Sequence, residues 1–225
     1  MQKIGMLVAV EMESVLSKYG TAKEVIDCGG FRVHAYQTDA YTLYVLNSGV
    51  GEIAAAAGTQ LLISVFGVEM IVNFGVVGGL TDEMAMARTC IVRKAVHYDF
   101  DTSQIDPVAP AQYAQYPDVF IPATEDLIEK AIALEPGLVP VICASADKFV
   151  GDPLKKAELH KRYGADICEM EAAGILLTCN RSGIPVLLIK TVSDGITGGA
   201  DEFIKEVRRT SDICLSVADK IIRSL

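Results

Sequence analysis

The sequence predicts an α/β fold in three layers, with helices on both faces of a central, mixed, mostly parallel and twisted sheet. Apolar runs typical of buried strands alternate with helical patterns along the whole chain. Of the 225 residues, 51% are hydrophobic, which is enough for a substantial core. No linker, repeat or low-complexity segment interrupts this pattern, so we expect a single domain spanning 1–225.

Hydrophobic periodicity and glycine positions define the expected elements of the first half. Gly20 and Gly67 are expected to end two helices, and the second of these is rich in alanine. In chain order, we expect a strand at 3–10, a helix at 11–20, an antiparallel hairpin at 30–39 and 40–51, a helix at 52–67, and strands at 68–80 and 89–101.

The second half opens with a proline-containing loop at 102–118, which is too long for a simple connector. Thr124 and Asp152 are expected N-caps, and Pro153 suits a first helical turn. In chain order, we expect a helix at 123–134, a strand at 138–150, a helix at 152–164, a short strand becoming a helix at 165–183, a strand at 184–194 and a helix at 201–225.

The charge distribution argues against polyanionic and membrane partners. Net charge is −9 and no cluster of lysine or arginine appears, so a nucleic-acid partner is not expected. The apolar stretches are interrupted by glycine and glutamate, so none is expected to span a membrane. A mean hydropathy of +0.33 indicates surface buried in a homo-oligomer, a core of parallel strands, or both.

The cysteines and histidines indicate neither a disulfide framework nor a metal site. The six cysteines form no C-x-x-C pair and lie mostly in apolar segments, which is typical of reduced thiols in a cytoplasmic protein. Three histidines form no H-E-x-x-H pattern. We therefore expect no metal and no cofactor.

Acidic residues follow several expected strands, where sites of α/β folds are found. Asp194 in "TVSDG" is either a turn aspartate or a carboxyl group in a partly dry crevice, where it could hold a proton. Glu11 and Glu13 in "VAVEMES" are either an acidic first helical turn or one of them points to the strand end. Glu169 and Glu171 in "CEMEA" pose the same choice between an exposed helix start and a site.

Together these segments resemble one family over almost the whole chain: the 5′-methylthioadenosine/S-adenosylhomocysteine nucleosidases of the nucleoside phosphorylase/nucleosidase superfamily. The segments are "KIGMLVAVEMES", "LNSGVGEIAAAAGTQLLI", "IVNFGVVGGL", "HYDFDTS", "SADKF", "CEMEAAGI" and "IPVLLIKTVSDG". The resemblance implies a nucleoside phosphorylase-like fold, a homodimer, and cleavage of the N-glycosidic bond of an adenine nucleoside by water.

The resemblance also implies roles for individual residues. Asp194 matches the general acid that protonates N7 of adenine, with Ser193 supporting it. Counting from the first strand, Glu13 rather than Glu11 matches the residue that orients the attacking water. Glu171 matches the glutamate that accepts hydrogen bonds from the ribose hydroxyls, with Met170 against the sugar.

Further positions match the binding of the base or depart from the family pattern. Phe149 matches the aromatic residue that stacks on adenine, and the backbone of Val150 would read its edge. Glu169, two residues before Glu171, is also expected to belong to the substrate-binding site. Val76 stands where the family usually has serine, and Lys148 where a small or neutral residue is common.

Hydrolysis is favoured over phosphorolysis, because Glu11 and Glu13 would repel phosphate and no arginine lies nearby. Alternatives are a purine or pyrimidine nucleoside phosphorylase, a hydrolase of another purine nucleoside such as a futalosine-type compound, and a nucleoside-binding protein without catalysis.

Overall fold

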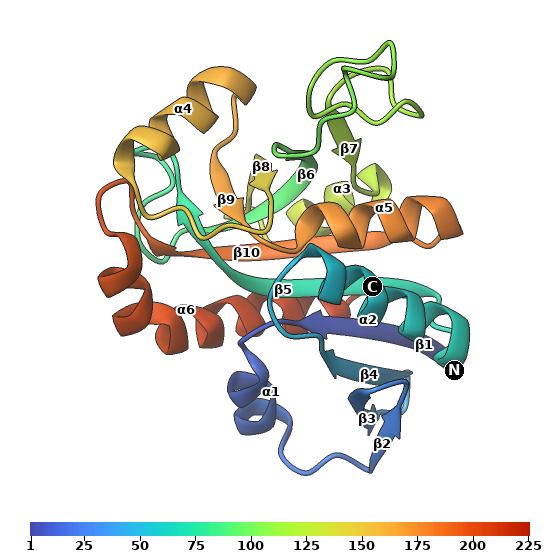
Figure 1. The fold of residues 1–225 in the computed structure, drawn as a ribbon. Helices are drawn as coiled ribbons and strands as arrows, with labels where there is room; N and C mark the ends of the chain where they lie inside the picture. The colour runs from blue at the N-terminus through green and yellow to red at the C-terminus, as the bar shows by residue number, and fades with distance from the viewer.

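The computed structural model describes residues 1–225 and has the expected layered α/β fold, with a mixed sheet between helices (Figure 1). The strands are β1 (Gln2–Val8), β2 (Glu24–Cys28), β3 (Phe31–Gln37), β4 (Tyr41–Asn47), β5 (Met70–Gly79), β6 (Thr89–His97), β7 (Phe120–Pro122), β8 (Val139–Ser145), β9 (Ile167–Glu169) and β10 (Val186–Asp194). The helices are α1 (Met12–Tyr19), α2 (Glu52–Leu61), α3 (Glu125–Leu134), α4 (Pro153–Tyr163), α5 (Ala172–Ser182) and α6 (Gly199–Ile222), and a π-helical turn, η1 (Leu62–Phe66), continues α2.

Strand β5 organises the sheet. It pairs in parallel with β1 and with β10, and its last residues, Gly78 and Gly79, pair antiparallel with β9. From β10 the pairing continues through β6 and β8 back to β9, so these strands close into a ring with β5. The carboxyl ends of β1, β5, β9 and β10 consequently lie near one another.

Two apolar layers hold the helices against the sheet. One layer includes Leu46 and Ile71 of the sheet with Leu176 of α5, on the face that α2 and α5 cover. The other includes Ile4 of β1 and Leu215 of α6, on the face that α1, α3 and α6 cover (Figure 1). The strands between these layers are buried on both faces, which explains their continuous apolar sequences.

The expected elements are largely observed, with three differences. Strands β2 and β7 were not expected: β2 is an edge strand with exposed acidic residues, and β7 has only three residues. Asp152 caps α4 as predicted, accepting from the N–H of Leu154 at 2.8 Å. Thr124 occupies the N-cap position of α3 without a capping hydrogen bond, because its Oγ1 accepts instead from the N–H of Val186 in β10.

No helix combines the length and apolarity needed to span a membrane.

Candidate active site

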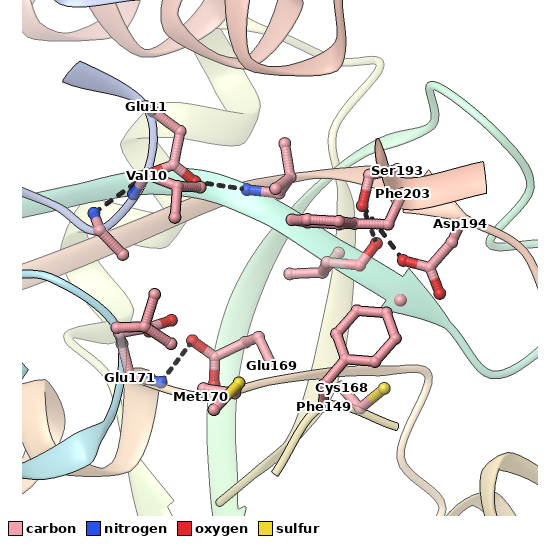
Figure 2. A pocket seen from close by; sticks show the side chains of 15 residues that line it. Val10, Glu11, Phe149, Cys168, Glu169, Met170, Glu171, Ser193, Asp194 and Phe203 are labelled. Carbon is pink, nitrogen blue, oxygen red and sulfur yellow. Dashed lines mark hydrogen bonds between the residues drawn. The ribbon is translucent and has the colours of Figure 1, made fainter. Parts of the chain in front are cut away.

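A cavity of about 290 Å³ opens where the strand ends meet (Figure 2). Its lining residues are Ala9, Val10 and Glu11 after β1, Val50 after β4, Val76, Val77 and Gly78 of β5, Phe149 after β8, Cys168, Glu169, Met170 and Glu171 at β9, Ser193 and Asp194 of β10, and Phe203 of α6. The predicted site residues that line this cavity are Val76, Phe149, Glu169, Met170, Glu171, Ser193 and Asp194. Val150 lines a smaller adjoining cavity of about 30 Å³.

Glu11 is held at the cavity wall by backbone N–H groups. Its Oε2 accepts from the N–H groups of Ala9 and Val10 at 3.0 and 2.9 Å, and its Oε1 accepts from that of Val76 at 3.1 Å. A Cβ at Gly75 would lie 2.8 Å from Glu11 Oε1, so the glycine leaves room for the carboxylate. Hydrogen bonds to both oxygens fix the orientation of the carboxylate.

Glu13, by contrast, lies outside the cavity, which contradicts its expected place in the site. Its side chain is 84% exposed and forms an ion pair with Arg208 of α6 at 3.0 Å. The reason is that α1 begins at Met12, directly after Glu11, so Glu13 already follows the helical path. The acidic residue of this segment that faces the cavity is Glu11.

Glu171 lies at the N-cap position of α5, nearly buried, with its Oε1 accepting from the N–H of Gly51 at 2.9 Å. Burial, and then the neighbouring carboxylate of Glu169, raise the pKa of Glu171 to about 7. The exposed helix start considered from the sequence is therefore not what the fold forms. Glu171 is a largely desolvated carboxyl group at the cavity wall.

Glu169 is fixed by several partners. Its Oε2 accepts from Lys190 Nζ at 3.1 Å and from the N–H groups of Glu171 and Ala172. Burial alone would raise the pKa of Glu169, but the Lys190 ammonium and the hydrogen bonds, including that from Ser145, hold it below its ordinary value. Glu169 is thus an ionised anchor beneath Glu171, and Lys190 neutralises it.

A buried acid, Glu52 of α2, adjoins this anchor. Ser145 Oγ lies within hydrogen-bond distance of Glu52 Oε1 and, at 2.5 Å, of Glu169 Oε1, and it accepts from the N–H of Ala173. A hydroxyl has one proton, so it can donate to only one of these two oxygens. Glu52 must therefore carry a proton and donate to Ser145. Burial, with the Glu169 carboxylate close by, raises the pKa of Glu52 to about 8.

Asp194 is the last residue of β10 and is buried at the cavity wall. The register of β10 against β5 shifts between Val192 and Asp194, a β-bulge that re-aims the chain at this point. Its Oδ1 accepts from Ser193 Oγ at 3.2 Å and its Oδ2 from Lys156 Nζ at 2.6 Å. The carboxyl group is therefore fixed at both oxygens.

Lys156, which was not predicted as a site residue from the sequence, is completely buried behind Asp194. A signal was present: Lys156, Leu159 and Tyr163 recur at helical spacing and form the buried face of α4. A lysine in an apolar helical stripe requires a partner, because an unpaired buried charge is costly.

The two ends of the cavity differ in character. Figure 2 shows Glu11 and Glu171 toward one end, and Asp194 near Phe149 and Phe203 at the other. The rings of Phe149 and Phe203 meet edge to face, with centroids 5.5 Å apart. The cavity thus has a carboxylate end, suited to hydroxyl groups, and an end with an aromatic face beside an acid, suited to a flat heterocycle.

Asp147 and Lys148 point elsewhere. Asp147 Oδ1 accepts from the N–H of Glu52 at 2.7 Å, at the start of α2. Lys148 Nζ lies 3.2 Å from Asp99 Oδ2 and lines only the smaller cavity. Lys148 consequently adds no charge to the main cavity.

Comparisons with known proteins identify the family of the chain. The family model described as the phosphorylase superfamily matches residues 3–225. A 5′-methylthioadenosine/S-adenosylhomocysteine nucleosidase of Shewanella putrefaciens is 32% identical over 155 residues, 67% of each chain. An aminodeoxyfutalosine nucleosidase of Helicobacter pylori is 28% identical over 94% of this chain and 95% of its own. The solved structure of a 5′-methylthioadenosine/S-adenosylhomocysteine nucleosidase of Helicobacter pylori shares the fold with a TM-score of 0.93, at 24% identity, covering 100% of this chain and 99% of its own.

The chain belongs to the phosphorylase superfamily. Within it, the protein is an N-glycosidic hydrolase of the nucleosidase type. The resemblance and the fold class predicted from the sequence are thereby confirmed.

Proposed function

We propose that the protein hydrolyses the N-glycosidic bond of 5′-methylthioadenosine and S-adenosylhomocysteine and releases adenine. The observation that carries the proposal is that Glu11, Glu171 and Asp194, which are distant in sequence, line one cavity. The bacterial relative at 32% identity is named for these two substrates.

At the aromatic end, Asp194 donates a proton to N7 of the base, because a neutral purine leaves far more readily than its anion. Phe149 stacks on the base, and the backbone of Val150 reads its edge. Ser193 holds the carboxyl group of Asp194 through the 3.2 Å contact. The aromatic face, the acid and its hydroxyl partner support this orientation of the nucleoside.

At the carboxylate end, Glu171 accepts hydrogen bonds from the ribose hydroxyls and Met170 packs against the sugar. Glu169 supports Glu171 from beneath, through the N–H of Glu171 at 3.1 Å. We assign the attacking water to Glu11 in place of Glu13, because Glu11 is the residue at the cavity wall. These negative charges favour the positive charge that develops on the sugar in the transition state.

The composition of the cavity wall favours water over phosphate. Its acidic residues are Glu11, Glu169, Glu171 and Asp194, and its lining includes no lysine or arginine. Lys156 and Lys190 are both buried in ion pairs with carboxylates. A phosphate dianion would meet repulsion here without a guanidinium or ammonium to bind it.

A second candidate substrate is an aminodeoxyfutalosine-type nucleoside, in which a different group replaces the methylthio group at the 5′ position. The alignment with the Helicobacter pylori aminodeoxyfutalosine nucleosidase spans 94% of the chain and supports this candidate. Values of kcat/KM for methylthioadenosine, S-adenosylhomocysteine, adenosine and aminodeoxyfutalosine rank the two candidates. The proposal is wrong if the first two substrates are not cleaved.

A homodimer and a cytoplasmic location are also part of the proposal. Val10 and Val50 at the cavity are about half exposed, and Ile53 nearby on α2 is exposed, so an apolar surface adjoins the site. A second copy of the chain is the partner we propose for it. The six unpaired cysteines, five of them buried, support a reducing compartment.

Replacing Asp194 by asparagine tests the acid. We expect Asp194→Asn to fold and bind nucleoside but to lose about 10²–10⁴-fold in kcat, since an amide cannot supply the proton. Adenine release is followed at saturating methylthioadenosine, and binding by calorimetry. Turnover near that of the wild type would remove Asp194 from this role.

A further inference from the structure

The ion pair between Lys156 and Asp194 joins α4 to the acid of the proposed site. Lys156 Nζ donates to Asp194 Oδ2 at 2.6 Å and to the carbonyl oxygen of Gly195 at 2.7 Å. The lysine side chain is completely buried, and that of Asp194 nearly so. Lys156 does not line the cavity, so it reaches a bound nucleoside only through Asp194.

The surrounding backbone leaves just enough room for this pair. A Cβ at Gly78 would lie 3.1 Å from Asp194 Oδ2, 3.3 Å from Lys156 Nζ and 3.0 Å from Cys168 Sγ. The absence of a side chain at this position of β5 therefore allows the ammonium and the carboxyl group to meet. The bulge in β10 turns Asp194 toward the same point.

We propose that Lys156 is a positioning residue for the acid of base release. Its ammonium occupies Oδ2 of Asp194, so the proton that Asp194 donates is carried on Oδ1, and the ammonium stabilises the carboxylate that remains once this proton has passed to the base. Charge-assisted hydrogen bonds of this length in a dry environment are strong, so the contact favours the product side of the proton transfer. The inference rests on the proposed function, in which Asp194 protonates the leaving base.

Lys156 acts in the step that releases the base. The bond between C1′ and N9 breaks and its electron pair goes to the base, while the carboxyl proton of Asp194 passes to N7. The oxygen of a water molecule bonds to C1′, and its proton passes to Glu11. Lys156 keeps all its protons, and solvent returns the proton of Glu11 to Asp194, so nucleoside and water give free base and free sugar.

The competing explanation is a purely structural one, in which Lys156 only ties α4 to the chain after β10 through Gly195. The two explanations differ in their dependence on the leaving group. A nucleoside methylated at N7 already has a cationic base that leaves without a proton. A residue that acts through the acid therefore matters for methylthioadenosine and little for its N7-methyl derivative.

The test compares Lys156→Met with Lys155→Met, which removes the exposed neighbouring lysine that pairs with Glu158 at 2.9 Å. With methylthioadenosine, we expect Lys156→Met to lower kcat by about 10- to 100-fold, part of the ~10²–10⁴-fold that acid catalysis contributes. KM should change by less than about 3-fold, because Lys156 does not touch the nucleoside. Turnover of the N7-methyl derivative should stay near that of the wild type, and Lys155→Met should leave both substrates unaffected.

Equal losses with the two substrates, or a KM that rises in step with the fall in kcat, would show that Lys156 is structural. An unchanged kcat would also overturn the inference. Thermal unfolding checks that Lys156→Met is folded. If Lys156→Met does not fold, Lys156→Gln is measured in the same way, because glutamine keeps an N–H donor without the charge. Wild-type protein that releases no adenine would instead contradict the proposed function, which keeps the two failures distinct.

Discussion

Glu11 and Glu13 are two positions apart in the sequence and have opposite surroundings. Three backbone N–H groups hold the carboxylate of Glu11 at the cavity, whereas Glu13 lies at the surface against Arg208. Counting residues from a strand could not separate them, because the choice depends on where α1 begins. Asp194 and Glu171 were proposed as site residues from the motifs around them, and both line the cavity, whereas the helical spacing that marks Lys156 as buried does not indicate its distant partner.

Substituting the two glutamates in turn tests this distinction. We expect Glu11→Gln to lower kcat by about 10²-fold or more, since an amide has one acceptor oxygen where the carboxylate uses two and it cannot take a proton from water. Glu13→Gln, the matched control, should stay within about 2-fold of the wild type, because surface ion pairs contribute little. Steady-state adenine release measures both. The reverse order of effects would return the role to Glu13.

The proton on Glu52 makes stability depend on pH. The pKa of Glu52 is about 8 in the folded protein and near the ordinary 4.5 when the chain is unfolded. Between these values the folded state binds more protons, so the contribution of Glu52 to stability is lost as pH rises from about 5 to 8. Glu52→Gln should lose less free energy of unfolding over that range, by on the order of 3 kcal/mol. Urea unfolding at pH 5 and pH 8 checks it, and parallel losses in both proteins would exclude a buried proton on Glu52.

At the scale of elements, glycines decide how closely the segments around the site approach. The strands and helices with strong periodicity were predictable, and so were the hairpin of β3 and β4 and the glycine ends of α1 and the helical segment after α2. The closure of β5, β10, β6, β8 and β9 into a ring was not, because pairing between distant strands leaves no local pattern. Gly174 lets α5 lie close to the start of α2, where its nearest neighbours are atoms of Glu52.

Gly174→Ala tests that contact. The added Cβ would lie 2.5 Å from the carbonyl oxygen of Glu52, which is backbone and cannot move away easily. We expect a loss of about 1–3 kcal/mol in unfolding free energy, as for overpacked cores, despite the better helix propensity of alanine. Gly137→Ala is the control, since nothing lies within 4 Å of its Cβ position. Denaturant unfolding measures both, and equal stabilities would mean that α2 and α5 separate at little cost.

At the scale of the whole molecule, strands from the two halves of the chain meet at one cavity, and apolar residues stay exposed near it. Ile53 on α2 is 81% exposed, beside the half-exposed Val50. The mean hydropathy of the sequence was consistent with such a surface or with a core of parallel strands. It could not distinguish them, because apolar residues buried in a sheet and apolar residues buried between two copies of the chain give similar compositions.

Ile53→Asp tests the dimer. A charge in an apolar interface is costly, so we expect this variant to shift toward the monomer and to lose activity in proportion. Leu154→Asp, at a position equally exposed on α4, should leave the assembly unchanged. Light scattering coupled to gel filtration measures the mass. A wild-type protein that is already monomeric at micromolar concentration would contradict the dimer.

The most direct test of the account is the rate of adenine release from methylthioadenosine by the wild-type protein, measured with and without inorganic phosphate. If Glu11 positions the attacking water and Asp194 supplies the proton, we expect full turnover in phosphate-free buffer and no acceleration when phosphate is added. Release of adenine that requires phosphate, or no release under either condition, would contradict it.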